Sequence, residues 1–287
     1  MKENLSIAEL QNKCIDLKKN AVSMIYKAQS GHPGGSLSVA EFVTACYWHA
    51  MDVDPQNPRW ADRDRFVLSK GHVCPAQYAA LAMKGYFPME VLDTLRKEGS
   101  PLQGHPSMTK CAGIDISTGS LGQGLACAVG MALAAKLDNK SYNVFCAVGD
   151  GECNEGQVWE ACQTAGHCKL DHFILFVDWN KKQLDGRVTE VCDPGSYEQR
   201  FSAFGFGCET VKGYDTEAIY HAIERAKADP GRPHCIVLDT VKGIGFDFAE
   251  AVEFNHYLTF DTEQAEKSVA EIERRYAAGT YPGGELK

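Results

Sequence analysis

Hydrophobic residues follow two spacings along the chain, and these predict helices that alternate with strands. Apolar residues that recur every three or four positions indicate helices, and short runs that are apolar at every position indicate strands. The predicted helices cover residues 8–28, 37–50, 75–86, 88–99, 121–137, 214–230 and 262–277. The predicted strands cover residues 65–69, 143–148, 173–178, 205–211 and 234–241. Strands of this continuous apolar kind are typical of a parallel sheet that is buried on both faces.

This alternation predicts an α/β fold: a doubly wound, mostly parallel sheet with helices on both faces. The chain has no internal repeat, low-complexity tract or linker, so we expect residues 1–287 to form one domain. The segment 121–137 is apolar nearly all round, and we therefore expect a helix that is buried on every side.

The charge of the chain argues against two classes of partner. Lysine and arginine number 29 against 38 acidic residues, which gives a net charge of −9, and no basic run stands out. Nucleic acids and anionic membrane surfaces are therefore poor partners. No apolar stretch approaches the roughly 18 residues of a membrane span, and residues 1–10 lack the apolar core and cleavage site of a signal peptide. We expect a cytoplasmic protein.

Twelve cysteines are scattered singly, and none forms a C-x-x-C pair. In a reducing compartment we interpret them as small, buried hydrophobic side chains. Without paired ligand spacing, a zinc site is not predicted.

Polar residues follow the predicted strands at the edge where doubly wound sheets bind ligands. Lys70 and His72 follow the first strand, residues 149–151 the second, Asn180 the third and Lys242 the last. Polar groups are costly to bury without partners. We therefore expect this edge to hold a polar ligand.

Asp150 lies between two glycines at the end of a strand, where the backbone can turn sharply and approach a ligand closely. The helix that follows directs free N–H groups to the same point, which favours a phosphate. A carboxylate and a phosphate repel unless a cation lies between them, so the pattern predicts Mg²⁺ or Ca²⁺ bound by oxygen atoms. Asn180 can add an amide oxygen, and a backbone carbonyl near Lys182 a third ligand. By itself, Gly-Asp-Gly is equally consistent with a turn in which Asp150 caps the helix.

Six stretches of the chain follow the order seen in transketolases and resemble that family. They are SGHPGGSLS, FVLSKGHVCPAQYA, QGHP, TGSLGQGLACAVGMALAAK, GDGECNEGQVWEA and TVKGIGF. Gly-Asp-Gly followed by an asparagine after 28 intervening residues is similar to the thiamine-diphosphate motif. The resemblance covers about residues 8–260 and is to the N-terminal, diphosphate-binding half of the family.

The resemblance implies a role for each matching residue. The metal, Mg²⁺ or Ca²⁺, would be bound by Asp150, Asn180 and the carbonyl of Lys182. Thiamine diphosphate would be contacted by Lys70, His72, Gly119, Leu121, Gly149, Gly151, Glu155, Asn180 and Lys242. The cleft around the thiazolium and the sugar hydroxyls would be lined by His32, His72, His105 and His256.

Histidines also suit the implied chemistry on physical grounds. Cleavage of a carbon–carbon bond beside a ketone needs an electron sink, which thiamine supplies, and proton transfer to sugar hydroxyls near neutral pH suits imidazole. One position departs from the family: His256 is followed by Tyr257, where transketolases usually have glycine. Glu155 and Glu160 match acids that link two active sites across the family's dimer interface, although acids at a helix start also favour its dipole.

In this family the cofactor lies between two different α/β domains. The resemblance implies that the pyrimidine-binding domain lies on a partner chain, the C-terminal transketolase subunit, in an α₂β₂ heterotetramer; a fragment of a longer enzyme is the other option. The implied reaction transfers a two-carbon ketol unit from a ketose to an aldose, with substrates that are phosphorylated or otherwise anionic. Two alternatives are another thiamine-dependent enzyme, such as a deoxyxylulose-phosphate synthase, and a catalytically silent cofactor-binding subunit.

Overall fold

A five-stranded parallel sheet lies at the centre of the computed structural model, which describes residues 3 and 5–277 of the predicted 1–287 unit; the other positions lie outside the described residues. The strands lie in the order β1–β2–β3–β7–β6. Their bounds are β1 (Arg65–Leu68), β2 (Val144–Gly149), β3 (Phe173–Trp179), β6 (Gly207–Lys212) and β7 (His234–Asp239). All neighbouring pairs are parallel. This confirms the predicted α/β class.

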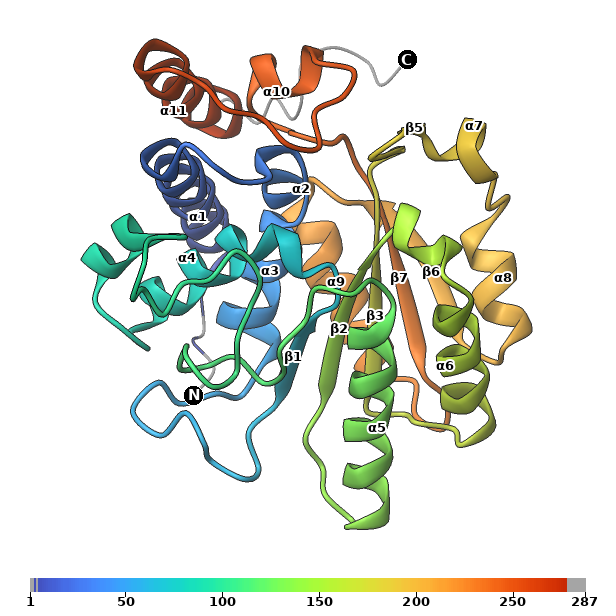
Figure 1. Ribbon diagram of the computed structural model, residues 1–287. Helices are drawn as coiled ribbons and strands as arrows, with labels where there is room; N and C mark the ends of the chain where they lie inside the picture. The colour runs from blue at the N-terminus through green and yellow to red at the C-terminus, as the bar shows by residue number, and fades with distance from the viewer. Residues whose placement is uncertain (1–2, 4, 278–287) are drawn as a thin grey trace.

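Helices cover both faces of the sheet (Figure 1). One face carries α1 (Ile7–Ala28), α3 (Ala40–Ala45), α4 (Cys74–Lys84) and α9 (Thr216–Lys227), and the other carries α5 (Gln123–Leu137), α6 (Gly156–His167) and α8 (Tyr197–Ala203). Each layer has its own apolar core. On β2, Phe145 and Ala147 belong to the first core, whereas Cys146 and Val148 belong to the second. Alternation of side chains along a strand therefore builds both cores from one apolar run.

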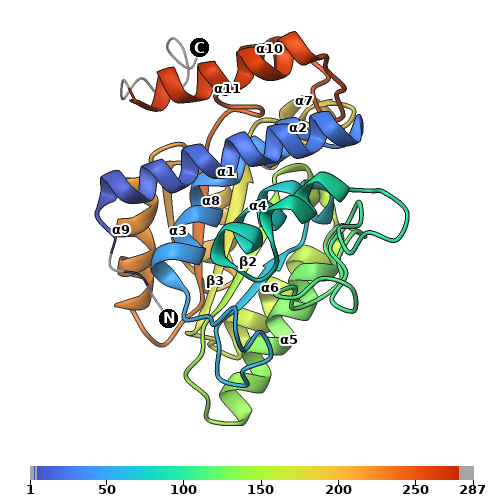
Figure 2. The ribbon, with the colours of Figure 1, turned by 90° about the vertical axis from the view of Figure 1, so that its left-hand side faces the viewer.

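Helix α1 begins at a capping box, in which Ser6 and Glu9 each accept a hydrogen bond from the other's backbone N–H, an arrangement that satisfies two free donors of the first turn. The last helix, α11 (Thr262–Ala277), runs alongside α1 (Figure 2). Both were predicted almost to the residue. The predicted Asp215 cap of α9 is also present, since its side chain accepts from the N–H of Ala218.

The helix predicted over residues 37–50 begins earlier and is divided. It consists of α2 (Pro33–Ser38), α3 and a π-helical turn, Cys46–Ala50. Gly34 and Gly35 thus lie inside α2 rather than before it. A Cβ at Gly34 would lie 2.5 Å from the carbonyl oxygen of Asn255, so only glycine permits this close approach.

Two expectations about burial are wrong. Strand β6 is not buried on both faces, because it lies at the edge of the sheet and only Gly207 of its residues is buried. Helix α5 is not buried all round either. Ala126, Cys127, Gly130 and Ala134 are exposed, and Leu137 is 72% exposed. Within the described residues, nothing packs over this side of α5 to bury it.

Shorter elements complete the chain. A 3₁₀ helix, Met89–Thr94, stands where an α-helix was predicted over 88–99. Further 3₁₀ turns are Gly71–Val73 and Gly151–Asn154. The elements without a separate prediction are the hairpin β4 (Lys182–Gln183) and β5 (Gly186–Arg187) and the helices α7 (Val188–Cys192) and α10 (Asp247–Ala251).

The cysteines mostly behave as predicted. All twelve are free, and those that are buried are Cys14, Cys46, Cys74, Cys111, Cys146, Cys153, Cys162 and Cys235. Cys127 and Cys192 are exposed. Among the described helices, none combines the length and the apolar character that a membrane crossing requires.

Candidate active site

A cavity of about 420 Å³ lies beyond the carboxyl ends of the strands. Every residue predicted for the site lines it, apart from two glutamates. The lining residues among those predicted are His32, Lys70, His72, His105, Gly119, Leu121, Gly149, Asp150, Gly151, Asn180, Lys182, Lys242 and His256. Glu155 and Glu160 lie at the start of α6, where both are exposed and neither lines the cavity. The structure therefore gathers residues from widely separated parts of the sequence around one cavity.

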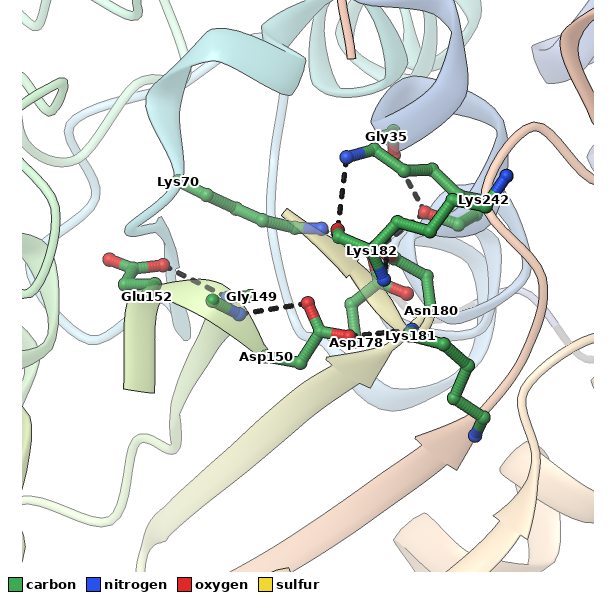
Figure 3. A network of polar contacts seen from close by, with 12 residues as sticks. Gly35, Lys70, Gly149, Asp150, Glu152, Asp178, Asn180, Lys181, Lys182 and Lys242 are labelled. Carbon is green, nitrogen blue, oxygen red and sulfur yellow. Dashed lines mark hydrogen bonds and ion pairs between the residues drawn. The ribbon is translucent and has the colours of Figure 1, made fainter. Parts of the chain in front are cut away.

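Two buried carboxylates lie side by side at the ends of β2 and β3 (Figure 3). Asp150 accepts hydrogen bonds from the N–H of Gly151 at 2.8 Å and from the N–H of Lys181 at 2.7 Å. Asp178 was not assigned a role from sequence, yet its Oδ2 accepts from Ser38 at 2.7 Å and pairs with Lys70. Its Oδ1 is buried without a partner in the described structure. This edge therefore has spare acceptor capacity.

Burial raises the pKa of Asp150 to about 7, and the negative charge of Asp178 adds to the shift. Burial likewise lowers the pKa of Lys242 to about 8. Both shifts disfavour charge, because burial removes water that would stabilise it. The site therefore gains from any ligand that brings compensating charges.

The three atoms predicted to bind a metal face one another across the strand ends (Figure 3). The Asn180 amide nitrogen donates to Asp178 at 2.8 Å, which leaves its Oδ1 as an acceptor, and that atom receives the N–H of Lys182 at 3.2 Å. The carbonyl of Lys182 accepts from the amine of Lys242 at 3.0 Å. One carboxylate, one amide oxygen and one carbonyl oxygen form a donor set that suits a hard divalent cation. The described residues contain no cluster of three or more His, Cys, Asp or Glu side chains that could hold a metal, so such a site depends on the amide and carbonyl oxygens.

Three imidazoles meet on the other side of the cavity. The ring centroids of His32, His72 and His256 lie 4.8 to 5.0 Å apart. Burial lowers the pKa of His32 to about 3 and that of His256 to about 4, and it also lowers the pKa of His72. All three are therefore neutral near pH 7, and the Nδ1 of His32 is buried without a partner in the described structure. Neutral imidazoles can donate and accept hydrogen bonds to hydroxyl groups.

His105 lies at the mouth of this cavity and is exposed. A Cβ at Gly119 would lie 3.2 Å from its ring, so the glycine allows the 118–121 loop to approach the imidazole. Burial lowers the pKa of His105, and the charge of Arg96 adds to that shift. Arg96 is a further cation near the histidines that sequence reasoning did not select.

Glu152 is the most connected residue that the sequence did not assign. Its carboxylate accepts hydrogen bonds from the hydroxyl of Ser69 at 2.5 Å and from the N–H groups of Gly122 at 2.7 Å and Gly149 at 3.0 Å. Burial raises its pKa, and these hydrogen bonds oppose the shift. Gly122 has φ +82° and precedes α5, a conformation that suits glycine. Glu152 thus ties the ends of β1 and β2 to the start of α5. The other lining residues that sequence reasoning did not assign are Gly35, Gln183, Leu184 and Asp185.

We expect Glu152→Ala to lower the free energy of unfolding by about 3–5 kcal/mol. Three buried donors would lose their acceptor, and each unsatisfied donor costs about 1–3 kcal/mol. Urea denaturation followed by circular dichroism measures the change. Glu160→Ala is the matched control, because that glutamate is exposed on α6. A loss below about 1 kcal/mol would show that water or other groups replace the carboxylate easily.

The chain matches known proteins over nearly its whole length. A family model described as "Transketolase, thiamine diphosphate binding domain" matches residues 11–276. A 6-deoxy-6-sulfo-D-fructose transketolase subunit of Clostridium sp. is 45% identical over 269 residues, which cover 94% of this chain and 98% of that protein. One of the two subunits of the apulose-4-phosphate transketolase of Phocaeicola vulgatus is 38% identical over 90% of this chain and 92% of its own length.

A solved structure supports the same assignment. Transketolase from Campylobacter jejuni is 33% identical and superposes with a TM-score of 0.86. The match covers 99% of this chain but 44% of that one, so this chain corresponds to less than half of that transketolase. The predicted fold and the recognised motifs are thereby confirmed. The chain belongs to the transketolase family, in which it is an N-terminal, thiamine diphosphate-binding subunit of the split kind.

Proposed function

We propose that this subunit, together with a C-terminal partner subunit, transfers a two-carbon ketol unit from an anionic ketose to an aldose. The observation that carries the proposal is the cavity itself, which combines a charged edge for a diphosphate with a cluster of neutral imidazoles. A silent cofactor-binding subunit has no need for the second feature. The relatives named as transketolase subunits favour ketol transfer over deoxyxylulose-phosphate synthesis.

The charged edge suits the diphosphate and its metal. Bound thiamine diphosphate would supply the electron sink for cleavage beside the ketone. Lys70 and Lys242 would neutralise the diphosphate, and the backbone of Gly149 and Gly151 would donate to it. Mg²⁺ or Ca²⁺ would be held by Asp150, Asn180 and the Lys182 carbonyl. The unpartnered Oδ1 of Asp178 supports the fit, since a buried acceptor without a donor favours a nearby cation.

The imidazoles would handle the sugar. His32, His72 and His256 would exchange protons and hydrogen bonds with hydroxyls near the reacting carbons, and His105 would do so at the mouth. Their lowered pKa values support this role, because neutral imidazoles accept protons without first losing one. Gly119 and Leu121 line the cavity opposite and would contact the rings of the cofactor through their backbone.

The exposed side of α5 supports association. Small and apolar residues form a stripe there, which we call the α5 stripe: Ala126, Cys127, Gly130, Ala134 and Leu137. Glu155 and Glu160 are exposed on the neighbouring α6. We propose that this surface is covered in an α₂β₂ heterotetramer, where the two glutamates would lie at an interface and Glu155 would approach the cofactor. Exposed apolar stripes of this kind favour association.

The substrate is tested by reconstitution with the partner chain. We propose a ketose that carries a terminal anionic group, and the sulfo-sugar named for the 45% identical relative makes a sulfonate the first choice. Ketol transfer is measured with a 6-sulfo-ketose, its 6-phosphate counterpart and the neutral ketose, each with the same aldose acceptor. Equal kcat/KM for the neutral sugar would contradict the anionic substrate, and pyruvate condensation without ketol transfer would contradict the reaction.

We expect His32→Ala and His105→Ala to lower kcat of the reconstituted enzyme by about 10²- to 10⁴-fold, the usual contribution of a positioned acid–base group. The affinity for thiamine diphosphate should change far less, because neither side chain lies at the charged edge. Steady-state kinetics and calorimetry separate the two effects. His221→Ala is the control, since His221 is exposed on α9 and pairs only loosely with Glu217. Near-full turnover in both variants would refute the assignment.

A further inference from the structure

We propose that Tyr257 is a specificity-determining residue, whose ring forms a wall at the mouth of the cleft and limits the length of the ketose. The inference rests on the proposed function and refines its substrate class. It concerns the position at which this chain departs from the transketolase pattern. Nothing in the fold requires an aromatic ring at this exposed position, whereas its contacts place it beside the imidazoles.

The segment that carries Tyr257 is rigidly anchored. Asn255 is only 1% exposed, and its amide nitrogen donates to the carbonyls of Lys242 at 2.9 Å and Ala249 at 2.7 Å. The Asn255 carbonyl also packs so closely on Gly34 that a Cβ there would lie 2.5 Å from it. His256, the next residue, accepts or donates at 3.1 Å to the amine of Lys242. The side chain of Tyr257 therefore starts from a fixed backbone.

The ring of Tyr257 stands against His32. The two ring centroids lie 5.5 Å apart with an interplanar angle of 80°, an edge-to-face contact that is favourable between aromatic rings. The phenol hydroxyl donates to Ser30 at 3.2 Å. The side chain is 47% exposed, so one side of the ring contacts the histidine and the other side faces solvent. Two contacts at opposite ends hold the ring upright.

This position puts the ring at a boundary between two cavities. His32 lines the cavity of the candidate active site, whereas Ser30 lines a second cavity of about 450 Å³. The reacting carbons of a ketose would lie at the imidazoles, so its far end would extend toward the mouth. A ring fixed between His32 and Ser30 would meet the far end of a long ketose. Removal of the ring would join the two cavities and admit a longer chain.

The test uses the enzyme reconstituted with its partner and donor ketoses of five, six and seven carbons that carry the same terminal phosphate. Tyr257→Gly should raise kcat/KM for the seven-carbon donor, relative to the five-carbon donor, by about tenfold or more. Discrimination by one carbon unit in a shaped pocket is worth about 10- to 200-fold. Tyr257→Phe, which keeps the ring, should leave this ratio within about threefold of the original value. The affinity for thiamine diphosphate serves as the check on folding.

Phe254→Gly is the matched control, because Phe254 is an exposed aromatic residue three positions away. A ratio that stays constant in Tyr257→Gly, or that changes equally in Phe254→Gly or Tyr257→Phe, would overturn the proposal. Failure of the proposed function has a separate signature, which is no turnover of any ketose by the unmodified enzyme. In that case the same ratio is read from the dissociation constants of linear five-, six- and seven-carbon polyol phosphates. An unchanged ratio of dissociation constants in Tyr257→Gly would again overturn the role of the ring.

Discussion

Asp150→Ala is expected to abolish detectable binding of thiamine diphosphate at ordinary Mg²⁺ concentrations. Asp150 is the one carboxylate among the three proposed metal ligands. Without it, the cation would depend on the Asn180 amide and the Lys182 carbonyl, and the diphosphate charge would be poorly neutralised. Loss of a residue that merely orients a metal ligand costs about 10- to 100-fold in affinity, so loss of the charged ligand should cost more than about 100-fold.

Calorimetric titration of thiamine diphosphate into the reconstituted enzyme measures this effect, with Asp193→Ala as the control at an exposed aspartate. The fold should survive, because burial already disfavours the ionised form of Asp150. Unchanged cofactor affinity in Asp150→Ala would rule the residue out as a ligand.

The raised pKa of Asp150 adds a pH dependence to the same experiment. The pKa of about 7 lies above the ordinary value of 3.8, so below pH 7 the metal-free site holds a proton on this carboxyl. A cation must displace that proton. The affinity for Mg²⁺ should therefore fall by up to about tenfold per pH unit as the pH drops below 7, and level off above it. A flat profile between pH 5 and 8 would contradict Asp150 as the titrating ligand.

The site was predictable from sequence because of how parallel strands end. Residues that follow β2, β3 and β7 in sequence meet at one edge of the sheet, whatever the helices between them do. Lys70, Asp150, Asn180 and Lys242 are therefore brought together by a topology that the apolar runs already predict. The histidines belong to loops, and their convergence depended on the resemblance to transketolases.

The errors have a physical reason too. The apolar character of an element does not reveal which neighbours cover it, and for that reason α5 and β6 were both expected to be more buried than they are. Glu152 and Asp178 were missed for the opposite reason. An acid close to a turn usually faces solvent, and the donors that bury Glu152 include Ser69, which lies 83 positions away. Only the folded chain brings these groups together.

This chain purified without its partner is expected to show no ketol transfer and to bind thiamine diphosphate weakly. The described residues provide the diphosphate edge and the imidazoles, whereas in this family the pyrimidine end of the cofactor is held by a second domain. With that end unsupported, the reactive part of the cofactor would remain in water, where the preorganised environment that the reaction needs is absent. The α5 stripe would meanwhile expose small and apolar residues, a state that favours obligate association.

A substitution on the α5 stripe separates loss of assembly from loss of fold. A Cβ at Gly130 meets no atom within 4 Å, so Gly130→Arg should fold normally but block any partner that packs there. We expect this variant to lose both the heterotetramer mass and the activity when it is mixed with the partner chain, as measured by light scattering and a ketol-transfer assay on the same sample. Glu217→Arg is the control, because Glu217 is exposed on α9, on the opposite face of the sheet. Because the charged edge and the imidazoles are untouched by either change, a selective loss in Gly130→Arg would trace activity to association through α5. Full activity of the unmodified chain as a monomer or homodimer would instead mean that both ends of the cofactor are held without a partner chain, and the proposed heterotetramer would be wrong.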